Sequence, residues 1–107
     1  MDSQRTLRDV QQEIDDLIKV RWHSHYWAPL SSLARLTEEV GELAREINHH
    51  YGEKPKKAGE GTGSIASEMG DILFILASLA NSLDIDLDTA FEEVMAKYQQ
   101  RDARRWP

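Results

Sequence analysis

The sequence contains no cysteine, only three prolines and no long uninterrupted apolar segment. Without cysteine the chain can form neither a disulfide nor a thiolate zinc site. Its N-terminus is polar, and the longest uncharged apolar run, Ile72 to Leu83, is too short to span a bilayer. We therefore expect no secretion signal and no membrane partner, and a cytoplasmic protein is the default.

Basic residues are also scarce, with 13 lysines and arginines against 19 acidic residues and a net charge of −6. This balance argues against binding to a nucleic-acid polymer through its phosphates. An acidic protein that handles polyphosphate needs a metal ion to do so. A chain of 107 residues is expected to form one domain, residues 1–107, and it is small enough that oligomerisation would stabilise it.

Apolar residues recur at helical spacing in four segments, which predicts an all-α, four-helix bundle-like domain. The predicted helices cover about residues 3–20, 29–50, 64–83 and 87–104. Ser3, Ser64 and either Asp86 or Asp88 are the expected N-caps, and Pro29 suits the first turn of its helix. The third helix is apolar on nearly every side, so we expect a homodimer or homotetramer to cover it.

Two of these helices carry carboxylate pairs at a spacing of three residues, which places each pair on one helical face. Glu39 borders the apolar stripe of the second helix and Glu42 lies just beyond it, where the stripe comprises Leu33, Leu36, Val40, Leu43 and Ile47. Glu68 and Asp71 lie on the apolar side of the third helix, whereas Glu38 points outward from the second. We therefore expect Glu68 and Asp71 to be buried and the two pairs to face each other.

Burying several like charges is costly unless a cation neutralises them. Oxygen-only ligands select hard cations, and a site with few carboxylates and room for water and phosphate suits Mg²⁺ or Mn²⁺. The residues thus predict a metal site.

The spacing of the acidic residues resembles that of a known family. Glu38-Glu39-x-x-Glu42, followed after 25 residues by Glu68-x-x-Asp71, is similar to the EExxE and ExxD motifs of the MazG-type, all-α nucleoside triphosphate pyrophosphohydrolases. The chain looks most like the small single-domain, YpjD-type members of that family. The likeness also runs through residues 29–48, 51–57 and 70–86.

This resemblance implies hydrolysis of a nucleoside triphosphate between the α and β phosphates, giving the monophosphate and pyrophosphate. Glu39, Glu42, Glu68 and Asp71 would hold Mg²⁺, with Mn²⁺ as a substitute, and the ion would orient the attacking water. Glu38 and Glu39 are the candidate catalytic residues, Glu38 as a base or as support for the ligands. Relatives act on canonical, damaged or modified nucleotides, which implies housekeeping of the nucleotide pool.

The resemblance further implies that Lys97 and Arg101, on the last helix, approach the substrate phosphates. Cations that complement a helix C-terminus are the alternative. Lys54 lies in a glycine- and lysine-rich loop, residues 52–63, which is either a solvated linker or a lid that meets phosphate.

Residues 21–28 contain two tryptophans, a tyrosine and two histidines. Either this segment is an aromatic plug that seals one end of the bundle, or it forms a nucleobase pocket. In the second case Trp22 and Trp27, with His23 and His25, would hold the base by stacking.

Two further function classes compete with the enzyme. In a non-catalytic helical oligomerisation module the acidic clusters would be solvated faces and the third helix a dimer seam. A di-iron carboxylate oxidoreductase would use Glu46-x-x-His49, but such a bundle needs two copies of this motif and the chain has one.

Overall fold

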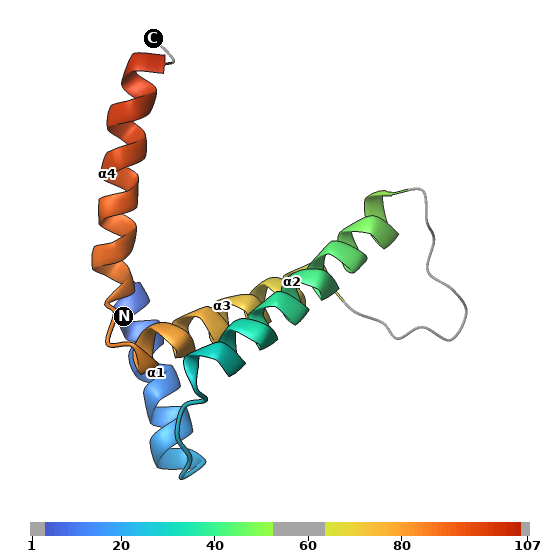
Figure 1. Cartoon of the computed structure of the whole chain (residues 1–107), viewed down its shortest axis with the longest axis vertical. Coiled ribbons are helices and arrows are strands. Elements are labelled where there is room, and N and C mark those ends of the chain that lie inside the picture. The colour runs from blue at the N-terminus through green and yellow to red at the C-terminus, as the bar shows by residue number, and fades with distance from the viewer. Residues whose placement is uncertain (1–3, 53–63, 106–107) are drawn as a thin grey trace.

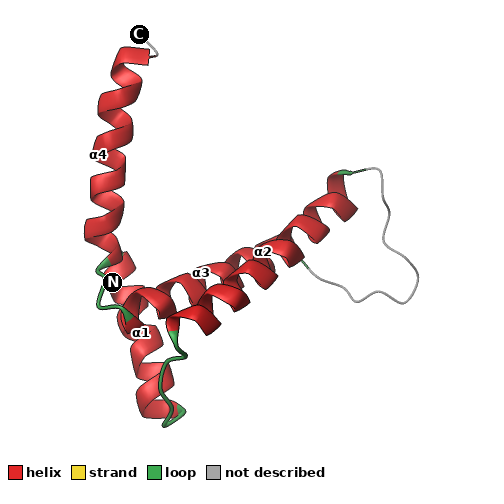
Figure 2. Ribbon diagram, in the orientation of Figure 1, coloured by secondary structure: helices red, strands yellow, loops and turns green. Residues whose placement is uncertain are grey.

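The structure, a computed structural model, describes residues 4–52 and 64–105, and these residues form helices and no strand (Figure 2). The elements are α1 (Leu7–Asp15), continued by a π-helical segment (Asp16–Arg21), then α2 (Pro29–Tyr51), α3 (Ile65–Ser82) and α4 (Leu87–Arg105). The predicted all-α class with four helices is confirmed.

α2 and α3 run side by side, and α1 packs across the end of this pair (Figure 1). α4 contacts α1 near its own start and then extends away from α2 and α3. The radius of gyration is 17.3 Å, against about 13 Å for a compact domain of this length. Within one chain the bundle therefore consists of α1, α2 and α3, with α4 standing apart.

Side-chain caps decide where the helices begin. The Thr6 hydroxyl accepts a hydrogen bond from the Asp9 N–H, and the Asp9 carboxylate accepts one from the Thr6 N–H. Because this reciprocal capping box starts α1 at Leu7, the expected start at Ser3, which lies outside the described residues, is wrong. Ser64, by contrast, caps α3 as predicted by accepting from the Ser67 N–H.

The junction of α1 and α4 uses two aspartates. Asp86 accepts a hydrogen bond from the Asp88 N–H and so caps α4. Asp88 in turn accepts from the N–H groups of Leu7 and Arg8, at 3.1 Å each, and satisfies the first turn of α1. The Arg8 guanidinium lies 2.6 Å from Asp86 and lowers the pKa of that carboxyl. The first turns of the two helices are thereby held together.

A small core, with a buried polar network beside it, joins α1 to α3. The core is formed by Ile14, Ile18 and Ala77. The buried Gln11 side chain donates to the Asn81 Oδ1 and to the Ile85 carbonyl, each at 2.8 Å. Its oxygen accepts from the Leu87 N–H, while Asn81 donates to the Gln11 carbonyl and to the Tyr26 hydroxyl. Every polar group of this network thus finds a partner.

Much apolar surface stays exposed in the single chain. The expected stripe of α2 and core face of α4 are only partly covered, since the exposed side chains include Leu33, Val40, Ile47, Phe91, Val94 and Tyr98. The accessible surface is 8298 Å² for a 12.3 kDa chain, against roughly 6,100 Å² for a compact monomer of that mass. These faces lack a cover within the described part of the chain.

At 18 residues, α3 is long and apolar enough to cross a membrane by length and composition alone. The expectation from the sequence concerned only the shorter uncharged run, Ile72 to Leu83, which this test of the whole helix does not contradict. One such helix is weak evidence for a membrane span, since the core helix of a soluble protein passes the same test. α3 packs along α2 and α1, and it carries Glu68 and Asp71.

The Gln11 network predicts a specific loss of stability. Replacing Gln11 with Leu leaves the Asn81 Oδ1 atom and the Leu87 N–H without the side-chain partner that they have in the wild type, so we expect a loss of about 1–3 kcal/mol in the free energy of unfolding. Urea denaturation measures it. Gln12→Leu is the matched control, because Gln12 is exposed and bonds only to Asp16 among the described residues. Equal losses in the two variants would show that the network contributes nothing specific.

Candidate active site

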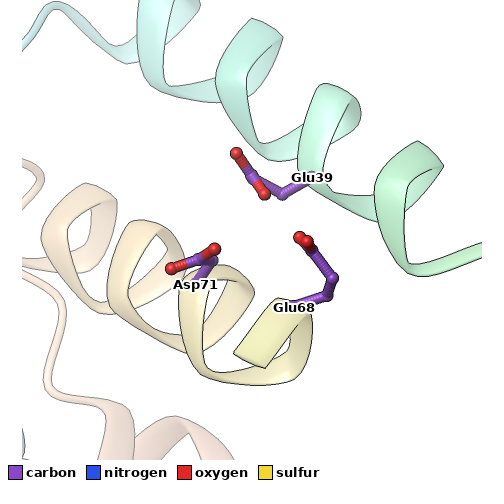
Figure 3. A group of neighbouring side chains, drawn as sticks. All are labelled: Glu39, Glu68 and Asp71. Carbon is purple, nitrogen blue, oxygen red and sulfur yellow. The ribbon is translucent and has the colours of Figure 1, made fainter. Parts of the chain in front are cut away.

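Three carboxylates from two helices meet between α2 and α3. Glu39 projects from α2, and Glu68 and Asp71 project from α3 toward it (Figure 3). One oxygen of each lies within 4.8 Å of the others. Glu39 is 5% exposed, Glu68 is half-buried and Asp71 is exposed. The predicted meeting of the two acidic motifs therefore occurs, although the expected burial of Asp71 is wrong for the single chain.

Helical spacing explains why a glutamate lies in this interface. The buried residues of α2 are Ser32, Glu39 and Glu46, one every seven residues, so they share a face. The side of α2 that packs against α3 is thus partly polar, whereas Val40 and Ile47 of the expected apolar stripe are about half exposed. Because Glu39 is buried, the acidic cluster is not the solvated face that a non-catalytic module would present.

Electrostatics in the cluster favours a bound cation. The pKa of Glu68 is raised, first by the adjacent Glu39 carboxylate, then by burial and by the charges of Asp71 and Glu42. The Oε1 atom of Glu68 is buried and has no hydrogen-bond partner. Two carboxylates so close together need either a shared proton or a cation between them. An all-oxygen ligand set of this kind fits Mg²⁺ or Mn²⁺.

The two remaining glutamates of the predicted site lie at its edge. Glu42 is exposed and outside the group of three, yet close enough for its charge to raise the pKa of Glu68. Glu38 is exposed, as its position on the helix predicted, and its carboxylate lies 3.1 Å from the Arg35 guanidinium. Arg35 also lies 2.8 Å from Glu39. Sequence reasoning missed this arginine, although its place four residues before Glu39 was the available signal.

A cavity of about 280 Å³ adjoins the carboxylates. Trp22, His25 and Trp27 line one side of it, and Glu39 and Asp71 line another. The α3 wall consists of Phe74, Ile75 and Ser78. Sequence reasoning assigned these residues no part in a pocket, although they continue the face of Asp71 at helical spacing.

The aromatic segment is therefore a cavity wall rather than a plug. His23 has a positive φ of 50° and reverses the chain after the π-helical segment, with the Ser24 N–H donating to the Ile18 carbonyl. It does not line the cavity, so its expected role in base stacking is wrong. Tyr26 donates its hydroxyl proton to Asp15 and accepts from Asn81. Burial, together with the hydrogen bond to Asp15, raises the pKa of Tyr26 to about 12, so it remains a neutral donor.

The predicted phosphate-binding residues are not at this site in the same chain. Lys97 and Arg101 lie on the exposed part of α4, which extends away from the cluster (Figure 1). The Arg101 guanidinium lies over the Tyr98 ring, 4.6 Å from its centroid. Lys54 lies outside the described residues.

The family model for the MazG nucleotide pyrophosphohydrolase domain matches residues 28–106. Among curated proteins, the uncharacterized protein YpjD of Bacillus subtilis is 54% identical over 104 residues, covering 97% of this chain and 93% of that protein. The uncharacterized protein YvdC of Bacillus subtilis is 27% identical over 106 residues, covering 94% of this chain and 95% of that protein.

Two solved structures are similar over nearly the whole chain. One is the putative pyrophosphatase YPJD from Bacillus subtilis, with a TM-score of 0.81 and 51% identity, covering 94% of this chain and 100% of that one. The other is the Bacillus-conserved MazG protein, a nucleotide pyrophosphohydrolase, with a TM-score of 0.75 and 47% identity, covering 92% of this chain and 93% of that one.

The raised pKa of Glu68 predicts how the metal-free protein responds to pH. Folded Glu68 keeps its proton above the ordinary pKa of 4.5, so the folded state binds more protons than the unfolded state as the pH rises from there. Its stability should therefore fall as the pH rises from about 4.5 toward the raised value. Glu68→Gln should lose this decrease and be at least as stable as wild type at pH 7.5 in EDTA, as calorimetric melts will measure.

Adding millimolar Mg²⁺ should raise the melting temperature of the wild type with increasing concentration, because the ion binds the folded state. The response of Glu68→Gln should be much smaller. Glu93→Gln, at an exposed position of α4, is the control and should respond like wild type. Identical, metal-insensitive melts for all three proteins would contradict the metal site.

Proposed function

Because the chain belongs to the MazG nucleotide pyrophosphohydrolase family, we propose that it hydrolyses nucleoside triphosphates, with Mg²⁺, to the nucleoside monophosphate and pyrophosphate. Family membership and the two solved relatives make it a nucleotide pyrophosphohydrolase. The observation that carries the metal and the reaction site is the meeting of Glu39, Glu68 and Asp71 beside the aromatic cavity. Housekeeping of the nucleotide pool in the cytoplasm is the proposed role.

The three clustered carboxylates hold the ion, with Glu42 one turn along α2 as the fourth ligand. When bound, Mg²⁺ neutralises phosphate charge and lowers the pKa of a coordinated water, and Mn²⁺ is the expected substitute. Of the two candidate catalytic residues, Glu39 is the one within the cluster. Glu38 points to solvent and contacts Arg35, so its role is support of the site.

The cavity supplies the nucleobase site. Its volume of about 280 Å³ is near the lower end of small-molecule pockets, roughly 300 Å³, which suits a base with the phosphates outside. Trp22 and Trp27 offer flat aromatic faces for stacking. Stacking does not discriminate strongly among bases, so the enzyme is proposed to accept canonical or modified nucleotides.

The site predicts its products. With the triphosphate bridging from the base cavity to the carboxylates, water attacks the α phosphorus, so nucleoside triphosphates should yield monophosphate and pyrophosphate and no diphosphate. Reactions in ¹⁸O-labelled water, separated by chromatography and analysed by mass spectrometry, should place the label in the monophosphate. Glu39→Gln should be nearly inactive and is the control for contaminating phosphatases. Diphosphate with orthophosphate as the main products would contradict the assignment.

A second chain is proposed to complete the site. Lys97 and Arg101 are too far along α4 to serve the carboxylates of their own chain (Figure 1). The same helix exposes Phe91, Val94 and Tyr98. An exposed apolar face of this kind is typical of an interaction surface. In a homodimer, or in a homotetramer built from two dimers, this face is covered and the two cations reach the phosphates bound by the partner.

Mixing two inactive variants tests this arrangement. Glu68→Gln lacks a metal ligand, and the double variant Lys97→Ala, Arg101→Ala lacks the phosphate contacts. Co-refolded in equal amounts, they should regain up to about a quarter of wild-type activity, because a mixed dimer contains one site with all its residues. Light scattering should give at least a dimer. No recovery from mixed dimers would place Lys97 and Arg101 outside the site of the partner.

A further inference from the structure

Arg35 lies between two carboxylates at the edge of the cavity. One guanidinium nitrogen is 3.1 Å from Glu38 Oε1, and the other is 2.8 Å from Glu39 Oε2. The Arg35 side chain is 48% exposed, and it lines the same cavity as the aromatic segment. A single cation therefore joins the outward-facing glutamate of the acidic motif to the buried glutamate of the metal cluster.

We propose that Arg35 is a built-in counter-ion that competes with the metal ion for Glu39, and that Glu38 retains the guanidinium when the ion is bound. Arg35 and Glu38 are then positioning residues that set the metal affinity of the site. This inference rests on the proposed function, because it assumes that the carboxylate cluster binds a divalent cation.

Burial supplies the first reason. Glu39 is 5% exposed, and a buried carboxylate without a counter-charge is costly. Arg35 provides that charge for Glu39, whereas the buried Oε1 of the neighbouring Glu68 has no hydrogen-bond partner. A guanidinium keeps its charge at every pH at which the chain is folded. Glu39 therefore has a permanent cation beside it. A metal ion that binds Glu39 must displace this guanidinium or interact with the carboxylate more strongly.

Helix stability alone does not explain the pair. An arginine four residues before a glutamate is the less favourable order for a helical ion pair, because it opposes the helix dipole. The contact to Glu38 has the same order at a spacing of three residues. The surroundings of Arg35 are instead those of the carboxylate site. Its pKa is raised by Glu38, by Glu39 and, across the interface, by Asp71.

The outward position of Glu38 does not by itself indicate a role for this residue, but the contact with Arg35 provides one. The guanidinium has five N–H donors in a fixed fork, so it binds Glu38 and Glu39 with different edges. Losing Glu39 to a metal ion leaves the Glu38 edge in place. Glu38 thus lowers the free-energy cost of releasing Glu39, and removing Glu38 should weaken metal binding through Arg35.

A double-mutant cycle on metal binding alone tests the proposal. The metal-free proteins are wild type, Arg35→Gln, Glu38→Gln and the double variant, each titrated with MnCl₂ at pH 8 while free Mn²⁺ is followed by electron paramagnetic resonance. The Kd of Arg35→Gln should fall about tenfold, because the competitor is gone. The Kd of Glu38→Gln should rise about threefold, because Arg35 then depends on Glu39 alone.

The decisive quantity is the effect of Glu38→Gln in the Arg35→Gln background. If Glu38 acts by holding Arg35, this second substitution should leave Kd unchanged. If Glu38 acts only as a nearby negative charge, it should weaken binding by the same factor in both backgrounds, and that result overturns the proposal. An unchanged or higher Kd for Arg35→Gln also overturns it.

Arg21→Gln is the control for the loss of one positive charge, because Arg21 is exposed at the end of the π-helical segment and forms no ion pair with the three clustered carboxylates. Its Kd should equal that of wild type. If Arg35→Gln does not fold, Arg35→Lys replaces it, since an ammonium keeps the charge but cannot hold both carboxylates in the same fork. That variant should bind Mn²⁺ about two- to threefold more tightly than wild type, and an unchanged Kd overturns the proposal. Absence of Mn²⁺ binding by the wild type would instead refute the proposed metal site itself.

Discussion

The mutual repulsion of the carboxylates between α2 and α3 is the constraint to which the rest of the structure responds. Glu39, Glu68 and Asp71 are held within reach of one another, and such a cluster opposes the packing of the two helices. α2 and α3 nevertheless pack directly against each other, side by side, while apolar contacts and the hydrogen bonds of Gln11 and Asn81 hold α1 to α3 at the end where α1 crosses. Packing elsewhere in the bundle thus holds together a carboxylate cluster that is destabilising without the proposed cation.

The aromatic wall of the cavity depends on the same anchored end. After His23 reverses the chain, the Tyr26 hydroxyl is held between Asp15 and Asn81. Trp22 and Trp27 flank this fixed point, so the position of the cavity wall is coupled to the polar network that joins α1 and α3. The proposed base site and the proposed metal site therefore adjoin each other in one cavity.

α4 shows the limit of what a single short chain can bury. Its start is bonded to α1 through Asp86 and Asp88, while its apolar residues beyond the first turn remain exposed. A helix that is secured at one end and exposes an apolar face presents a surface for another copy. The proposed assembly would cover that surface and bring basic residues to an acidic site with the same contact.

The sequence by itself determined the helices and the acidic motifs. Helical periodicity located four helices to within a few residues, except at the first, where the Thr6–Asp9 capping box outcompeted Ser3. The spacings of Glu39 with Glu42 and of Glu68 with Asp71 placed each pair on one face, because that relation is local and follows from the helical repeat. Local geometry also explains why Glu38 was correctly expected to point outward.

Only the tertiary structure decided which carboxylates meet, how deeply each is buried and which residues surround them. The relative rotation of α2 and α3 placed Glu39 in their interface and left Asp71 exposed, and no local pattern specifies that rotation. The contact of Arg35 with Glu39 and the cavity behind it likewise depend on packing between segments far apart in the chain. The amphipathic pattern of α4 could not predict the direction of this helix. An apolar face indicates that a helix packs against a partner, but it does not indicate which chain supplies that partner.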